Sequence, residues 1–348
     1  MDGIREAIIW IRAHWETDYL TFMYELQESF LASAPDFSNN TFISKLKKEW
    51  ADRMLKEEEE DYTFLKLYTS EAGYRQIFSV LNNAFRIDEL EDEEVRLRAA
   101  VFLVELLTIE LFNYTFPRSI GDAEEARWEH SQGFTGIVYR GMRLSPDHLQ
   151  DFLDLMTKPI NERYWSIPLA FLSCTTSRDL AVKFANENTG DEQEKRRVLF
   201  RTHVVSLDLA SLKMYAKYFL TSVVTSVCAV DISALSLYPE EKEIVLRGPF
   251  FQLVNAKKET TEEGKELWIL DAVVFNTNRD HPSTMELTAE DGETARNLFA
   301  RLIEIARAKE CMRLAGECGL PDDVEGYARL RDEGQKRLAR LLLGFLKL

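Results

Sequence analysis

The sequence contains few of the residues that build metal centres or disulfide frameworks. Its 348 residues include four cysteines and five histidines. The cysteines fit neither a C-x-x-C metal knuckle nor a disulfide framework, and no histidine pair has the H-E-x-x-H spacing of a zinc protease. The four are Cys174, Cys228, Cys311 and Cys318. We therefore predict no metal, no cysteine nucleophile and a reducing compartment.

Positive charge, glycine-rich loops and long apolar runs are also scarce. Lys and Arg number 43 against 59 Asp and Glu, which gives a formal net charge of -16. A chain this acidic is poorly suited to gripping phosphate backbones, so nucleic acid is not an expected partner. The glycines form no phosphate-binding loop of the P-loop kind. No window approaches the ~18 uninterrupted apolar residues that a membrane-spanning helix needs.

The amino terminus lacks the features of a secretory signal. The stretch "MDGIREAIIWIRAHWETD" opens with an acid, and Arg12 breaks its short apolar run. It has neither a basic n-region nor a small-residue cleavage site. We expect no membrane anchor, and we expect the protein in the cytoplasm or delivered into a host cell as an effector.

The hydrophobic periodicity divides the chain into three parts. Apolar residues at three- and four-residue steps predict helices in the first third, among them 68–86 and 92–116. β-branched and aromatic runs then predict strands, with helices at 145–157, where Ser145 is the expected N-cap, and at 177–188. The predicted strands are 134–142, 167–177, 197–209, 224–235, 243–258 and 266–275. The end of the chain is helical again.

A β-rich block behind an α-rich block is typical of the α+β class rather than of alternating β-α-β units. We predict a helical amino-terminal region over 1–60, a core domain over 61–280 and a helical carboxyl-terminal region over 281–348. Within the core domain, a helical lobe (61–130) precedes a β core (131–280). No pattern in the sequence predicts the oligomeric state.

Three carboxylates stand at the start of an apolar strand, in the stretch "YPEEKEIVL" (238–246). Side chains alternate along a strand, so Glu241 and Glu243 are expected on one face, roughly 6.6 Å apart at Cα. Like charges this close raise the pKa of one of the two. Such a pair suits a positive charge that arises only transiently, as in the oxocarbenium-like transition state of glycosidic bond cleavage. A solvated acidic turn is the alternative interpretation of these residues alone.

Three motifs in sequence order resemble those of one family. The first is "VYRGM", with Arg140 followed by Gly141. The second is "FLSCTTSRDLAVKFA", a hydroxyl-rich strand end that runs into a helix. The third is "SLYPEEKEIVLRGPFFQL", an aromatic and proline turn, then Glu-x-Glu, then an apolar strand. Over roughly residues 65–276 they resemble the mono-ADP-ribosyltransferases of the arginine–serine–glutamate type, which include vertebrate ecto-enzymes, their rotifer relatives and several bacterial toxins.

The resemblance implies a fold and an activity. The implied fold is a pair of packed β-sheets with an NAD-binding cleft between them, behind a helical amino-terminal lobe and with a helical carboxyl-terminal extension. The implied activity is transfer of ADP-ribose from NAD to a side chain of an acceptor protein, with arginine favoured because Glu241 is Glu rather than Gln. An NAD glycohydrolase and a catalytically weak binding module on the same fold are the alternatives.

The resemblance also implies roles for residues of the first and third motifs. Arg140 would grip NAD through its planar fork of donors, or else form a surface salt bridge. Gly141 would let its backbone approach the nicotinamide carboxamide, or serve as an ordinary turn glycine. Glu243 would be the catalytic residue, bonding the nicotinamide-ribose hydroxyl and stabilising the cation as nicotinamide leaves, and Glu241 would engage the acceptor. Tyr238 would contact the acceptor protein from the turn, or simply be exposed there.

The second motif departs from the family's Ser-Thr-Ser. Counted back from the helix, the motif falls on 175–177, so Thr175 takes the place of the leading serine and Ser177 that of the last. The Thr175 hydroxyl would then bond the nicotinamide-side ribose or Glu243. If the alignment slips by two residues, Ser173 takes that place. Phe184 would stack on nicotinamide, and a helix-face core aromatic is an equally good interpretation.

Overall fold

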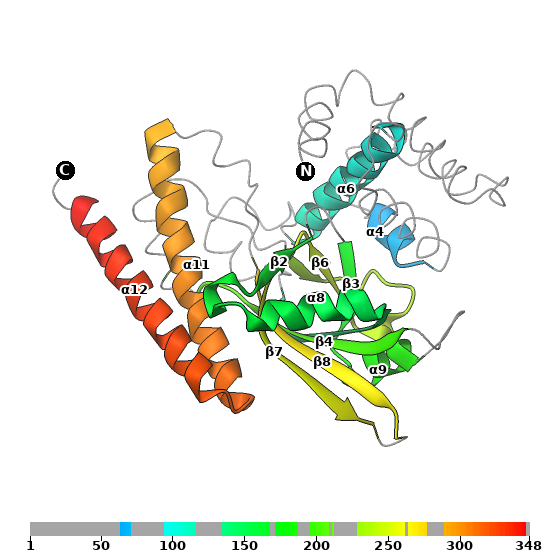
Figure 1. Cartoon of the computed structure of the whole chain (residues 1–348). Coiled ribbons are helices and arrows are strands. Elements are labelled where there is room, and N and C mark those ends of the chain that lie inside the picture. The colour runs from blue at the N-terminus through cyan, green and yellow to red at the C-terminus, as the bar shows by residue number, and fades with distance from the viewer. Residues whose placement is uncertain are drawn as a thin grey trace, which may run out of the picture. The chain divides into compact units, whose positions relative to one another are not determined.

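The computed structural model describes residues 63–70, 94–115, 134–167, 171–186, 195–208, 211, 228–261, 264–276 and 289–345 (Figure 1). The chain forms two compact units. Unit 1 comprises Met1–Gln132, Leu169–Leu172 and Ile232–Glu240, and unit 2 comprises Gly133–Pro168, Ser173–Asp231 and Glu241–Leu348. The predicted amino-terminal region, 1–60, lies outside the described residues, and the predicted domain boundaries stay a prediction.

Unit 1 contains two described helices, α4 (Thr63–Tyr68) and α6 (Glu94–Thr115). The second confirms the helix predicted over 92–116, whereas most of the one predicted over 68–86 lies outside the described residues. Residues 100–104 of α6 are all apolar and all buried. The carboxylate of Glu110 in α6 accepts a hydrogen bond of 2.9 Å from the backbone N–H of Leu65, which ties α4 to α6.

Eight described strands form one mixed sheet in the order β2-β7-β8-β4-β1-β3-β6-β5 (Figure 1). The strands are β1 (Gly136–Leu144), β2 (Tyr164–Ser166), β3 (Phe171–Thr175), β4 (Arg196–Val205), β5 (Ala229–Asp231), β6 (Glu243–Arg247), β7 (Phe250–Thr260) and β8 (Glu266–Phe275). β4 pairs with β8 in parallel and with β1 in antiparallel orientation. The α+β class is therefore confirmed.

The strands of the two expected sheets are hydrogen-bonded to each other. The family resemblance implies two packed sheets, but the hydrogen-bonded strands are connected as one. The connection between β1 and β3 is narrow, since Tyr139 and Thr175 are the Cα partners that the two strands share. The two expected sheets are thus the five-stranded and three-stranded parts of one sheet, joined at a single residue pair.

Two helices in unit 2 follow strands that build the site. α8 (Pro146–Thr157) begins after Ser145, whose hydroxyl oxygen accepts a hydrogen bond from the backbone N–H of His148 (3.3 Å). Ser145 is therefore the N-cap, as predicted, and proline stands at the first helical position, where its missing N–H is not needed. α9 (Arg178–Asn186) follows β3 directly and also lies where a helix was predicted. Among the helices that the structure describes, none is long and apolar enough to cross a membrane.

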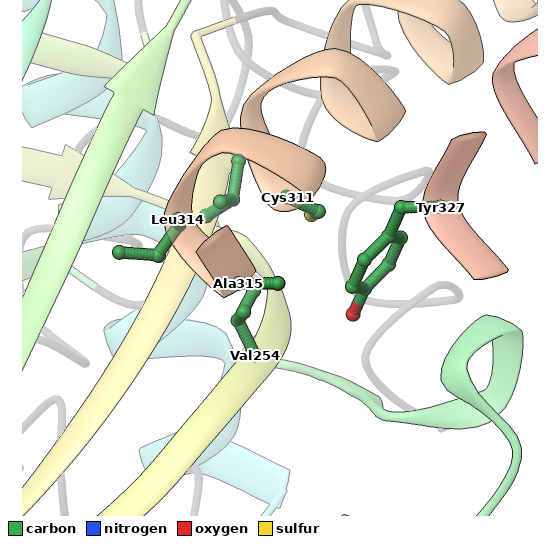
Figure 2. Packing of buried hydrophobic residues seen from close by; sticks show 6 residues of the cluster. Val254, Cys311, Leu314, Ala315 and Tyr327 are labelled. Carbon is green, nitrogen blue, oxygen red and sulfur yellow. The ribbon is translucent and has the colours of Figure 1, made fainter. Parts of the chain in front are cut away.

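The carboxyl-terminal helices, α11 (Ala289–Glu317) and α12 (Pro321–Phe345), form a hairpin that packs on the sheet of unit 2. Gly319 has φ +72°, the left-handed conformation that ends a helix, and the N–H of Leu320 bonds the carbonyl of Ala315 (2.9 Å). Figure 2 shows Cys311, Leu314 and Ala315 of α11 beside Val254 of β7 and Tyr327 of α12.

The core in Figure 2 makes the hairpin an integral part of unit 2. Val254, Leu314 and Ala315 are fully buried, and Tyr327 is 2% exposed. The register of β7 against β8 shifts between Leu253 and Asn255, so Val254 lies at a bulge, where the strand meets the hairpin. All four cysteines of the chain lie within the described residues, and none of them forms a disulfide.

Candidate active site

Glu243 is the first residue of β6, and all five residues of that strand are buried. The side chain that the sequence places at the mouth of the strand is only 7% exposed. Glu241 does not belong to the strand, because Pro239–Glu241 form a 3₁₀ turn, η3. Lys242 follows with φ +48°, a left-handed conformation that is uncommon for a residue other than glycine. The expectation that Glu241 and Glu243 lie on one face of the same strand is therefore wrong. Their relative position is determined by the turn that precedes β6.

The environment of Glu243 favours its proton. The pKa of Glu243 is raised from 4.5 to about 6, chiefly because burial disfavours the charged form and also because of the charge of Glu241. A hydrogen bond from the Ser173 side chain and the charge of Arg140 act in the opposite direction. The predicted interaction between the two acids is thus present, although desolvation is the larger cause.

Arg140, Ser173 and Glu243 come together from three neighbouring strands, β1, β3 and β6. The guanidinium of Arg140 donates a hydrogen bond through Nη1 to the backbone carbonyl of Ser173. The hydroxyl of Ser173 in turn bonds the Glu243 carboxylate. Arg140 therefore braces the strand that holds the Glu243 partner, and its charge lies close enough to stabilise the carboxylate.

Thr175 lies two residues further along β3 and has a different partner. Its hydroxyl donates a hydrogen bond of 2.6 Å to the backbone carbonyl of Glu241. The same hydroxyl oxygen accepts a hydrogen bond of 3.0 Å from the backbone N–H of Ser177. Of the two alignments of the second motif, the structure places Ser173 against Glu243 and Thr175 against the turn.

The remaining predicted residues of the second and third motifs lie as follows. The hydroxyl oxygen of Ser177 accepts a hydrogen bond of 3.3 Å from the backbone N–H of Leu180, so Ser177 is the N-cap of α9. Phe184 on α9 is 42% exposed and is not a core aromatic. Tyr238 belongs to unit 1 and is 38% exposed.

Position 141 has no room for a side chain, which the sequence alone did not indicate. A Cβ at this position would lie 1.6 Å from the carbonyl oxygen of Ala181, so the backbone of α9 rests directly on β1. Arg143, two residues along the same strand, donates from Nε to the carbonyl of Ala185 (3.2 Å) and from Nη2 to that of Asn186 (3.4 Å). These are the last carbonyls of α9, where a cation is favourable. Both contacts join distant parts of the chain, so no local signal announces them.

Cys174 stands between Ser173 and Thr175 but has no nucleophilic character. Burial raises the pKa of its thiol to about 12, and the charge of Glu243 adds to this while Arg140 opposes it. The thiol is therefore protonated at neutral pH and unreactive. Among the described residues, no group of three or more His, Cys, Asp or Glu side chains is arranged to hold a metal ion.

The arrangement suits a reaction in which positive charge develops on the substrate. A buried carboxylate with a raised pKa has an unfavourable charge, and a cation that arises beside it relieves that cost. The Ser173 hydroxyl fixes the orientation of the carboxylate, and the Glu241 turn brings a second acid near it. This is the chemistry expected for breaking a bond at an anomeric carbon.

No protein-family model matches the chain, and no curated protein matches it. Several solved structures show a remote likeness, among them three ADP-ribosyltransferases. The Vis toxin, an ADP-ribosyltransferase from Vibrio splendidus, is 14% identical with a TM-score of 0.36, over 66% of this chain and 83% of that one. The ADP-ribosyltransferase HopU1 of Pseudomonas syringae pv. tomato is 17% identical with a TM-score of 0.34, over 70% and 82%.

The third neighbour is Plx2a, an ADP-ribosyltransferase toxin from Paenibacillus larvae. It is 16% identical with a TM-score of 0.33, over 66% of this chain and 92% of that one. Because these identities and TM-scores are low, the activities in these names are properties of those proteins. The function of this chain has to be inferred from its own residues.

Proposed function

We propose that this protein cleaves the bond between nicotinamide and ribose in NAD and transfers the ADP-ribose to a side chain of an acceptor protein, arginine being favoured. The observation that carries the proposal is Glu243, a carboxylate that is 7% exposed with a pKa raised to about 6. It stands in the third of the three motifs that resemble arginine–serine–glutamate mono-ADP-ribosyltransferases, and residues of the first two motifs, Arg140 and Ser173, lie beside it.

In the proposed reaction, the bond between ribose C1′ and the nicotinamide nitrogen breaks and its electron pair leaves with nicotinamide. The ribose becomes oxocarbenium-like, and the ionised carboxylate of Glu243 stabilises this cation. A guanidinium nitrogen of the acceptor then forms a bond to C1′ and loses one proton, which Glu241 accepts. Arg140 is expected to bind NAD through its guanidinium fork.

Hydrolysis is the competing outcome, because water can attack the same cation. The nearness of Glu241 favours transfer: its charge contributes to the raised pKa of Glu243, so it lies close to the reacting centre. A carboxylate there binds an incoming guanidinium through two parallel hydrogen bonds, which water does not need.

The proposal is tested by measuring nicotinamide release from NAD by the wild type and by Glu243→Gln. The change keeps the size of the side chain and removes its charge, so we expect a rate loss of about 10²–10³-fold or more. Glu266→Gln, the same change on the exposed start of β8, is the control and should retain the wild-type rate. Turnover by Glu243→Gln within threefold of the wild type would remove Glu243 from the mechanism.

A second variant separates the two acids. Glu241→Gln is expected to retain much of the NAD hydrolysis and to lose transfer to agmatine, a small guanidinium acceptor. Both activities are measured on one preparation, as nicotinamide release and as ADP-ribosyl-agmatine. Equal loss of both activities would show that the acids do not divide the reaction as proposed.

A further inference from the structure

The hydroxyl of Thr175 connects three segments of the site. It lies at the end of β3, donates its hydrogen bond to the carbonyl of Glu241 in η3, and accepts one from the N–H of Ser177 before α9. A threonine hydroxyl has one proton to donate, and here that proton is directed at the turn. Because Thr175 is 5% exposed and its proton is engaged, it is placed to hold protein backbone rather than to contact a substrate.

Two effects favour a movement of the turn at Glu241, which the hydrogen bond from Thr175 opposes. Lys242 is in a left-handed conformation, φ +48°, which costs free energy for any residue other than glycine. The carboxylates of Glu241 and Glu243 also repel each other, as the effect of Glu241 on the pKa of Glu243 shows. Without a restraint, the repulsion is reduced when Glu241 moves away from Glu243, and the strain is relieved if the same movement changes φ of Lys242.

We propose that Thr175 is a positioning residue that fixes the Glu241 turn and thereby sets how ADP-ribose is divided between a guanidinium acceptor and water. This inference rests on the function proposed above. The hydrogen bond from Thr175 holds the backbone of Glu241, so the direction of the Glu241 carboxylate depends on it. Water needs no such direction, and therefore transfer depends on Thr175 more than hydrolysis does.

The first test is the ratio of transfer to hydrolysis in Thr175→Val, which keeps the shape and removes the hydroxyl. With NAD and agmatine, we expect the ratio to fall by about fivefold or more, the effect of one lost hydrogen bond. Thr175→Ser restores the donor and should return the ratio to within about twofold of the wild type. Thr157→Val removes an equivalent hydroxyl bond, to the carbonyl of Asp154 at the exposed end of α8, and should leave the ratio unchanged.

The second test requires no turnover and reports on the turn itself. The pKa of Glu243 is followed by ¹³C NMR of labelled glutamate carboxylates, with the resonance assigned by its loss in Glu243→Gln. The charged groups that act on this pKa are Glu241 and Arg140, and the Ser173 hydroxyl bonds the carboxylate. When the turn is released in Thr175→Val, Glu241 withdraws and the pKa of Glu243 should fall towards 4.5.

The outcomes separate the two proposals. If the wild type releases no nicotinamide, the proposed function is wrong, and the titration still decides whether Thr175 positions Glu241. If the wild type is active but Thr175→Val loses transfer and hydrolysis equally, with the pKa of Glu243 unchanged or raised, the positioning role is overturned. Should Thr175→Val not fold, Thr175→Ala, which also lacks the hydroxyl, replaces it with the same expectations.

Discussion

Two buried carboxylates in one sheet, Asp271 and Glu243, have opposite electrostatic environments. Asp271 in β8 is fully buried and accepts hydrogen bonds from Arg201 Nε (2.6 Å), Asn255 Nδ2 (2.9 Å) and Cys318 Sγ (3.4 Å). Glu243 in β6 is nearly as buried, but its strongest influences are desolvation and a hydroxyl, and a like charge stands beside it. Hydrogen-bond donors stabilise both oxygens of the Asp271 carboxylate. Burial and the charge of Glu241 instead destabilise the ionised form of Glu243.

The difference separates acids that stabilise the fold from the acid that we propose to be reactive. A third carboxylate, Glu310 in α11, belongs with Asp271: hydrogen bonds from His203 and Arg313 lower its pKa to about 2. The hydrogen bonds of Glu310 connect α11 with β4, and those of Asp271 connect β8 with β4 and with Cys318 after α11. A buried acid whose pKa is raised contributes no such stability, which makes Glu243 a candidate for a functional site.

The largest effect on stability is expected at the satisfied carboxylate. Asp271→Asn removes the charge that pairs with Arg201 while keeping the size, and should lower the free energy of unfolding by about 3 kcal/mol. Nicotinamide release per folded molecule should be unchanged. Urea denaturation followed by circular dichroism, with an activity assay on the same sample, measures both. A variant as stable as the wild type would mean that the donors around Asp271 do not hold it as described.

The opposite result is expected at Glu243. Glu243→Gln removes a charge that folding desolvates, so at pH 7 the variant should be more stable by up to about 2 kcal/mol. The folded protein holds the Glu243 proton more tightly than the unfolded chain does. That contribution to stability is therefore fully present below pH 4.5 and is lost as the pH rises through about 6.

Denaturation of the wild type and Glu243→Gln at several pH values tests this sign. The difference in unfolding free energy should favour the variant above pH 6 and shrink as the pH falls to 4.5. A variant that is less stable than the wild type at pH 7 would place Glu243 among the stabilising acids and remove the contrast with Asp271.

A smaller effect is expected at Lys242, whose left-handed backbone belongs to the reactive side of the comparison. Lys242→Gly should keep or raise stability by up to about 1 kcal/mol, since glycine adopts φ +48° without steric cost. Lys242→Val should lower it by about 1–2 kcal/mol, because a β-branched residue fits this conformation poorly. Thermal unfolding of both variants decides the point, and equal stabilities would mean that the turn is not strained.

The sequence was sufficient to predict the α+β class, the N-cap at Ser145 and the places of most strands, because these depend on local periodicity and on one side chain. It did not predict β2, and the strand predicted over 243–258 is two strands, β6 and β7. Glu243 became a candidate only through the resemblance of three motifs to one family, because the acidic stretch alone also fits a solvated turn. The reason for Gly141 could not be read in this way, because it lies in the distant carbonyl of Ala181. The pairing of Arg201 with Asp271 likewise depends on the parallel register of β4 and β8.

The relation of the two acids was predicted wrongly for a local reason. A run of Glu, Glu, Lys and Glu carries no sign of a positive φ, so Glu241 was assigned to the strand instead of η3. The choice between Ser173 and Thr175 depended on which hydroxyl of β3 faces β6. Ser173 and Thr175 are two positions apart on β3, so their side chains share a face. Only the three-dimensional position of the turn shows which of the two hydroxyls bonds Glu243.

The most direct measurement of the central claim is the pH dependence of kcat/KM for nicotinamide release from NAD by the wild type, which reports the free enzyme. If the buried carboxylate of Glu243 is the charge that stabilises the transition state, the rate should rise with pH through about 6 and then level off. A midpoint at the ordinary glutamate value of 4.5, or a rate that does not change between pH 5 and pH 8, would contradict it.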